Sequence, residues 1–280
     1  MMALKKKTIA RLKMPNMGGW NLWVDVWVRE GWRVQERAID VPARVLNTKN
    51  DIVFQSDKVS CIAFANSNAP ALKNPHVVVL LHGLGCGRGI MNKLERNFVE
   101  NNFTTANVGY PSLLKPIEYH AQALNSVVAH LRTSGAQSID IVAHSLGGLI
   151  ARVAIFDEPA LWQNASMVLI GSPARGSRVA EVLMKFKPFR FFAGECGRQL
   201  ILGAQLFPVL SMPICTLAGG NTGKGFNPFM GEDNDGTVLV SETHLESEQE
   251  FHLFPSLHNM LPRNPEVITC AVNFIKGAKS

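Results

Sequence analysis

The chain has 280 residues, of which 46% are hydrophobic, and it carries a formal net charge of +6. This length suits one α/β domain with a large core, and no apolar run is long enough for a transmembrane helix. The positive charge alone would suit nucleic acid, but no module of interleaved aromatic and basic residues accompanies it, which disfavours nucleic-acid binding. The five cysteines are odd in number and lack metal-ligand spacing, so we expect free thiols and no metal site.

Residues 1–50 are expected to form a basic, tryptophan-rich arm that precedes a main domain at residues 51–280. Lysine and arginine crowd the first 13 residues, which contain no acidic residue. The apolar core and the cleavage site of a signal peptide are missing, which predicts a cytoplasmic location.

The next stretch has an apolar face at helical spacing, formed by Trp20, Trp23, Val24, Trp27 and Val28. Tryptophans beside a basic cluster are typical of helices that lie in a membrane interface. We therefore predict peripheral contact of this arm with the inner face of the membrane. The alternative is that the tryptophans pack on the main domain or at a dimer contact, and Trp32-Arg33-Val34 would suit a strand.

The rest of the chain alternates predicted strands with predicted helices. Strands are expected at Val59–Phe64, Val77–Leu81, Thr104–Val108, Ile139–Val142, Met167–Ile170, Ile214–Ala218 and Glu250–Phe254. Helices are expected at Ile90–Glu100, Ile117–Arg132, Leu146–Phe156, Ser177–Phe186 and Glu266–Lys276. This alternation predicts an α/β fold with a mostly parallel central sheet and helices on both of its faces.

A glycine-rich loop follows the strand at Val77–Leu81, whose continuous apolar and β-branched run is typical of a buried central strand. The loop reads His82-Gly83-Leu84-Gly85-Cys86-Gly87. Its glycines allow the backbone to approach a bound group closely with N–H groups free. The loop lacks the lysine of a phosphate-binding loop and the spacing of a dinucleotide site. The alternative is a glycine-rich turn without a ligand.

Ala143-His144-Ser145-Leu146-Gly147-Gly148 stands between a predicted strand and a predicted helix. A serine flanked by small residues at such a turn is raised out of the backbone as a nucleophile. Ala143 replaces the usual glycine and is still small. The pattern predicts Ser145 as the nucleophile, although similar serines also occur in plain strand-to-helix turns.

A serine nucleophile of this kind is followed along the chain by an acid and then by a histidine. We expect Asp235 as the acid, because an Asp-Gly turn after the strand at Ile214–Ala218 would hold the carboxylate still. Asp233 is the alternative acid. We expect His258 as the base, because it lies between the last strand and the last helix, whereas His252 lies within the strand and is expected to be structural.

An apolar insertion at residues 186–212 separates two predicted strands. Its phenylalanines, leucines and prolines predict a cap or lid that covers an acyl chain. The alternative is that this segment packs on the sheet.

These segments together resemble the α/β-hydrolase superfamily, and within it the bacterial lipases and esterases, over roughly residues 75–277. Further similar segments are Gly109-Tyr110-Pro111-Ser112, Gly171-Ser172-Pro173-Ala174-Arg175-Gly176-Ser177, Asp235-Gly236-Thr237-Val238, and His258 with Leu261-Pro262. The resemblance implies a triad of Ser145, Asp235 and His258, with the backbone N–H groups of Leu84 and Leu146 as oxyanion donors.

The implied activity is a serine hydrolase that cleaves carboxylic esters of hydrophobic acyl groups, acting on a small-molecule or lipid ester without a cofactor. An acyltransferase or a thioesterase would use the same triad, and a non-catalytic lipid-binding or partner protein on the lipase fold is an alternative of another class.

Overall fold

The computed structural model describes residues 22–37, 42–174, 176, 194–199 and 210–278. Its larger sheet is parallel, with strand order β10-β9-β8-β7-β5-β6, and its smaller sheet is an antiparallel meander in the order β1-β2-β3-β4. The larger sheet contains β5 (His76–Leu81), β6 (Thr104–Val108), β7 (Ser138–His144), β8 (Met167–Ile170), β9 (Ile214–Gly220) and β10 (Glu250–Pro255). The smaller sheet contains β1 (Trp23–Arg29), β2 (Trp32–Arg37), β3 (Ala43–Leu46) and β4 (Ile52–Ser56).

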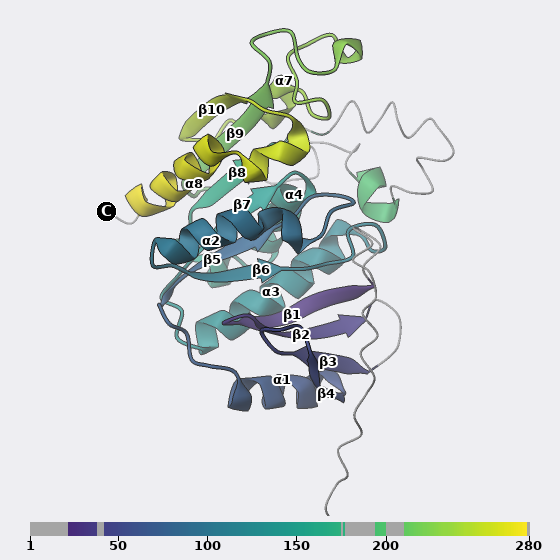
Figure 1. Cartoon of the computed structure of the whole chain (residues 1–280), viewed down its shortest axis with the longest axis vertical. Helices are drawn as coiled ribbons and strands as arrows, with labels where there is room; N and C mark the ends of the chain where they lie inside the picture. The colour runs from purple at the N-terminus through teal and green to yellow at the C-terminus, as the bar shows by residue number, and fades with distance from the viewer. Residues whose placement is uncertain (1–21, 38–41, 175, 177–193, 200–209, 279–280) are drawn as a thin grey trace, which may run out of the picture.

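Helices follow the strands of the larger sheet and cover both of its faces (Figure 1). The α-helices are α1 (Lys58–Asn68), α2 (Asn92–Glu100), α3 (Ile117–Thr133), α4 (Leu146–Asp157), α7 (Val240–Thr243) and α8 (Pro265–Gly277). Short 3-10 helices are η2 (Arg88–Met91), η3 (Pro159–Trp162), η5 (Pro228–Met230) and η6 (His258–Arg263). The predicted parallel α/β architecture is confirmed, because both layers of helices and the parallel register are present.

The central strand β5 shows why its sequence is apolar throughout. Val77, Val79 and Leu81 pack into one core with α3 and α4, while Val78 and Leu80 pack into a second core with α2 and α8. Both faces of the strand are therefore buried, so period-2 alternation is absent from its sequence. The burial of both faces also fixes the register of the strands. Because the strands are parallel, the loops that follow them all lie along one edge of the sheet.

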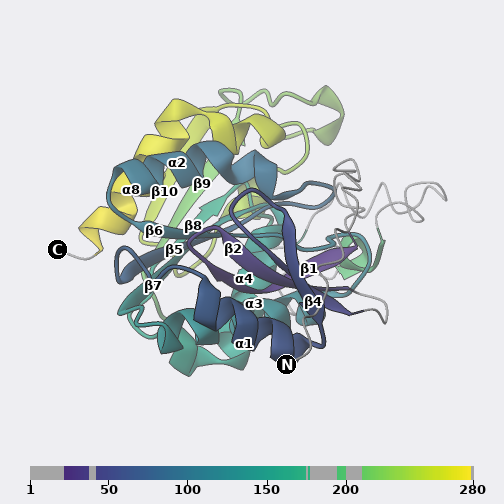
Figure 2. The same ribbon diagram turned by 60° about the horizontal axis from the view of Figure 1, so that its bottom comes forward.

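The prediction of a strand at Val59–Phe64 is wrong, because α1 occupies this segment. Asp57 begins the helix: its side chain accepts a hydrogen bond of 2.9 Å from the backbone N–H of Ser60. The helix buries Cys61 and Ala65 against the smaller sheet, beside β2, β3 and β4 (Figure 2). Capping and packing thus outweigh the strand propensity of the valine, isoleucine and phenylalanine in this segment.

The predicted helical face of tryptophans is also wrong, because β1 and β2 form a hairpin there. Trp27 is fully buried and its indole N–H donates a hydrogen bond of 3.1 Å to Asn66 Oδ1 of α1. The ring of Trp23 lies under the guanidinium of Arg44, 3.8 Å from ring centroid to Cζ. These two tryptophans pack within the domain, as the alternative interpretation held, and the predicted boundary at residue 50 falls between the paired strands β3 and β4.

Two other predictions fall mainly outside the described residues. The basic stretch Met1–Lys13 and Trp20 lie there, so the membrane contact of the arm stays a prediction. Most of the helix at Ser177–Phe186 and of the insertion at 186–212 lies there too, although residues 194–199 are helical and Cys196 is buried. Within the described ranges, no helix is long and apolar enough to cross a membrane.

Candidate active site

Ser145 occupies a sharp turn between β7 and α4, with φ 54° and ψ −123°. A residue with a side chain rarely adopts this backbone conformation, which costs about 1–3 kcal/mol and is concentrated at functional sites. The turn needs small neighbours: a Cβ on Gly147 would lie 2.8 Å from the carbonyl oxygen of His82 and 2.8 Å from Leu81 Cβ. The predicted strand-to-helix turn is therefore present, and Ala143 fits as a fully buried residue.

Three polar side chains form a continuous hydrogen-bonded chain at this turn. His258 Nε2 lies 3.0 Å from Ser145 Oγ, and His258 Nδ1 lies 2.6 Å from Asp235 Oδ2. The exposed fractions are 8% for Ser145, 7% for His258 and 1% for Asp235. The three side chains are therefore largely buried, and solvent has slight access to Ser145 and His258 but almost none to Asp235. An ionised carboxylate only accepts, so Nδ1 carries a proton and the neutral imidazole leaves Nε2 free to accept from Ser145.

Asp235 is fixed by backbone groups of its own loop. Its Oδ1 accepts hydrogen bonds from the N–H groups of Thr237 and Val238, at 2.9 and 2.7 Å. The backbone N–H of His258 donates to the Asp235 carbonyl oxygen at 2.9 Å, so the two residues are joined through both side chain and backbone. This double connection holds the imidazole toward Ser145.

Asp233, the alternative acid, has a different role. Its carboxylate accepts hydrogen bonds from the backbone N–H groups of Asn221, Gly223, Gly225 and Asn234, at 2.7 to 3.0 Å. Burial alone would raise the pKa of Asp233, but these four donors outweigh it and hold the pKa below its ordinary value. The carboxylate therefore organises the loop after β9, and Asp235 is the acid that contacts His258.

The glycine-rich loop after β5 lies directly against the serine. A Cβ on Gly83 would lie 3.0 Å from Ser145 Cβ and 3.0 Å from His144 Nδ1, so a side chain at this position would crowd the serine. Gly85 has φ 68°, and its N–H donates a hydrogen bond of 3.1 Å to the buried hydroxyl of Ser112. Among the described residues, no acceptor faces the N–H of Leu84 or of Leu146. The N–H groups of Leu84 and Leu146 therefore remain the predicted oxyanion donors.

Sequence reasoning missed a set of buried rings around this site. Tyr110 stacks on His82 with ring centroids 4.0 Å apart, and its hydroxyl donates to the His82 carbonyl oxygen. His144 Nε2 lies 3.2 Å from the carbonyl oxygen of His258. Burial lowers the pKa of His82 to about 4 and that of His144 well below its usual value, so both are neutral at pH 7. The only signal in the sequence is that these histidines adjoin the glycine loop and the serine.

The comparisons with known proteins agree with this architecture. A family model described as the PGAP1-like alpha/beta domain matches residues 91–187, which include Ser145. No curated protein sequence matches the chain.

Solved structures show the same fold at low sequence identity. The mature Bacillus licheniformis lipase BlEst2 has a TM-score of 0.59 and 17% identity, over 70% of this chain and 91% of that chain. A lipase-esterase related protein from Clostridium acetobutylicum has a TM-score of 0.51 and 14% identity, over 73% of this chain and 95% of that chain. The type II thioesterase BorB of the borrelidin biosynthetic cluster has a TM-score of 0.51 and 16% identity, over 75% of this chain and 94% of that chain.

The chain has the α/β-hydrolase fold, and it resembles the lipases and esterases that share this fold. The resemblance inferred from the sequence motifs is thereby confirmed at the level of the fold.

Proposed function

We propose that this chain is a serine hydrolase that cleaves carboxylic esters of hydrophobic acyl groups, as an esterase or lipase, through an acyl-enzyme on Ser145. The observation that carries the proposal is the hydrogen-bonded chain from Asp235 through His258 to Ser145. The strained turn at Ser145 and the close approach of Gly83 to Ser145 support it.

In the proposed reaction, His258 Nε2 takes the proton from Ser145 Oγ as this oxygen attacks the acyl carbon. Asp235 stabilises the imidazolium and keeps the proton on Nδ1. Charge develops on the carbonyl oxygen, which the N–H groups of Leu84 and Leu146 would bind. The alcohol leaves with the proton from Nε2, and water then attacks the acyl-enzyme by the same route and releases the acid and Ser145.

The test compares Ser145→Ala with Ser67→Ala, which removes an exposed hydroxyl on α1. Hydrolysis of a p-nitrophenyl ester should fall by about 10⁶ in the first variant, because the nucleophile is absent. Labelling by a fluorophosphonate should vanish with it, and Ser67→Ala should match the wild type in both assays. Activity and labelling retained in Ser145→Ala would overturn the assignment.

The preference for hydrophobic acyl groups rests on the apolar composition of residues 186–212. A series of p-nitrophenyl esters from acetate to palmitate, measured below and above micelle formation, tests it. We expect kcat/KM to rise with chain length. A maximum at acetate would contradict a hydrophobic acyl site.

A thioesterase is the second candidate, because the type II thioesterase BorB has a similar fold. Both activities need the same triad, so they differ only in the leaving group. Ester and thioester substrates that carry the same acyl group separate them, and faster acyl transfer to water from the thioester would favour this second candidate.

A further inference from the structure

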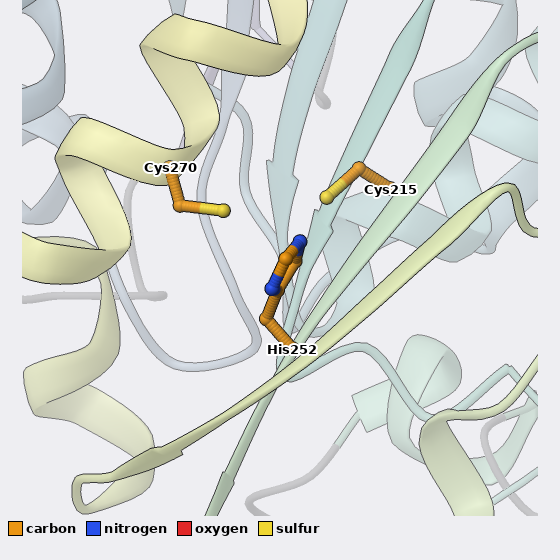
Figure 3. Close-up of side chains that lie close together, drawn as sticks. All are labelled: Cys215, His252 and Cys270. Atoms are coloured by element: carbon orange, nitrogen blue, oxygen red, sulfur yellow. The ribbon is translucent and has the colours of Figure 1, made fainter.

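We propose that Cys215, His252 and Cys270 form a binding site for a thiophilic divalent metal ion, of which zinc is the representative, separate from the triad. The three residues come from β9, β10 and α8, and Figure 3 shows their side chains directed toward one another. Their ligand atoms, two sulfurs and one imidazole nitrogen, all lie within 4.8 Å of one another. The proposal departs from the expectation of no metal that the cysteine spacing gave.

The strand register explains why the three side chains meet. Cys215 of β9 pairs with Glu250 of β10, and His252 is two residues further along β10. Residues that pair, and residues two apart, point to the same face of a sheet. Cys215 belongs to the core that α8 covers, and Cys270 of α8 packs against that core. The topology therefore brings three ligands together that are far apart in the sequence.

The kind and spacing of these ligands suit zinc. Zinc–sulfur bonds of about 2.3 Å and zinc–nitrogen bonds of about 2.0–2.1 Å place tetrahedral ligand atoms roughly 3.4–3.8 Å apart. The ligand atoms in the structure lie within 4.8 Å of one another, which is about 1 Å more than this. Small rotations about the side-chain torsions would bring them to the bonding distance. Two thiolates and an imidazole select zinc and related soft ions over magnesium or calcium.

The charged group beside the cluster favours a bound cation. The thiolate is the form of cysteine that binds metal, so binding of the ion would release protons from the two thiols. Glu250 Oε2 lies 2.9 Å from His252 Nε2 and adds a negative charge beside the cluster. Carboxylates in this position commonly orient metal-binding histidines.

The cluster is open to solvent on one side. His252 and Cys270 line a surface hollow of about 860 Å³, together with Glu250 and Glu266. The His252 side chain is 43% exposed, whereas Cys215 is fully buried. An ion can therefore enter from the hollow, and the fourth coordination position faces the hollow and is left for an oxygen ligand.

The position in the fold indicates a structural role for the ion. Cys215 on β9 lies two strands from β7 and His252 on β10 lies three strands from it, which is roughly 10 and 14 Å at the usual strand spacing. His258 lies in the connection between β10 and α8, the two elements that carry His252 and Cys270. A metal that joins these elements would brace both ends of the segment that carries His258.

The experiment measures zinc binding by the full chain, kept reduced and free of chelators, in competition with a chromophoric chelator. Cobalt(II) is the second probe, because thiolate ligands give it a near-ultraviolet charge-transfer band. We expect one zinc per chain, the cobalt–thiolate band, and a rise in melting temperature with zinc. Cys270→Ser and His252→Gln should each lower the affinity by more than the 10- to 100-fold that loss of an outer partner costs.

Cys86→Ser is the matched control, since Cys86 is also only partly buried but lies outside the cluster, and it should bind zinc as the wild type does. Circular dichroism without metal verifies that each variant is folded. Zinc binding that is unchanged in both folded ligand variants would overturn the proposal. So would a reduced wild-type protein that binds no zinc.

Discussion

Asp25 and Gly109 exchange two hydrogen bonds: the N–H of Asp25 donates to the Gly109 carbonyl oxygen at 2.9 Å, and the N–H of Gly109 donates to Asp25 Oδ2 at 2.7 Å. The fully buried Asp25 also pairs with Arg33 at 2.7 Å and accepts from Gln35 at 2.7 Å. Gly109 begins the loop that carries Tyr110 and Ser112, which contact the glycine-rich loop beside Ser145. The smaller sheet is thus connected to the oxyanion side of the site through one carboxylate.

The first prediction concerns the stability that this carboxylate provides. Asp25→Asn should lower the free energy of unfolding by about 3–5 kcal/mol, because it leaves the buried Arg33 guanidinium without its counter-charge. Urea unfolding measures the change. Glu36→Gln is the control, since the Lys58–Glu36 pair at 3.0 Å is partly exposed and should contribute less than about 1 kcal/mol. Equal losses in the two variants would contradict this account of Asp25.

Much of the fold and site could be predicted because the relevant signals are local. The strands β5 and β7 are short and almost wholly buried, and each is followed at once by its functional loop. Ser145 and Leu146 stand in one hexapeptide, and His258 lies between the last strand and the last helix. In a parallel sheet such loops share one edge, so chain order alone placed the acid and base near the serine.

The missed features depend on contacts between distant segments. β1 is buried along nearly its whole length, so it lacks the alternation of a half-exposed strand, and its tryptophans happen to fall at helical spacing. The Asp25–Gly109 contact joins residues 84 positions apart, and Cys215, His252 and Cys270 come from three elements. Sequence patterns report local periodicity and carry no signal for such pairings.

The second prediction separates the two acidic residues of the loop after β9. Asp235→Asn should lower kcat for a p-nitrophenyl ester by about 10⁴, because an amide no longer holds the productive tautomer of His258. Asp233→Asn should leave kcat within about tenfold, since the Asp233 carboxylate accepts hydrogen bonds from four backbone N–H groups of its loop and, among the described residues, from no side chain of the triad. Steady-state kinetics on the pair decides between them, and a larger loss in Asp233→Asn would reverse the assignment.

The third prediction concerns Ser112, whose hydroxyl accepts from the N–H of Gly85. Ser112→Ala should lower kcat by about 3- to 10-fold, the equivalent of one neutral hydrogen bond, because the loop that carries Leu84 is held less firmly. KM should change little if the loop acts on the transition state. An unchanged kcat, with Ser67→Ala as the reference, would show that this contact has no role in positioning.

The fourth prediction concerns the basic segment that precedes the smaller sheet. Deletion of residues 1–19 leaves β1 and its tryptophans in place, so it tests the basic stretch alone. Flotation with vesicles that contain anionic lipid should fall markedly in the deleted chain and should be salt-sensitive in the full chain. Equal flotation of the two chains would rule out membrane contact through this segment.

The last prediction concerns stability between pH 7.5 and 5.5. Burial lowers the pKa of His82 and of His120 to about 4, whereas both titrate near 6.5 in the unfolded chain. As the pH falls through this window, the unfolded state takes up protons that the native state does not, so stability decreases. The decrease should be about 1 kcal/mol for each histidine down to pH 5.5, and it should level off below pH 4. Urea unfolding at several pH values measures it, and His120→Gln should remove the share that belongs to His120. The same pH dependence in wild type and variant would show that His120 does not titrate as its burial implies.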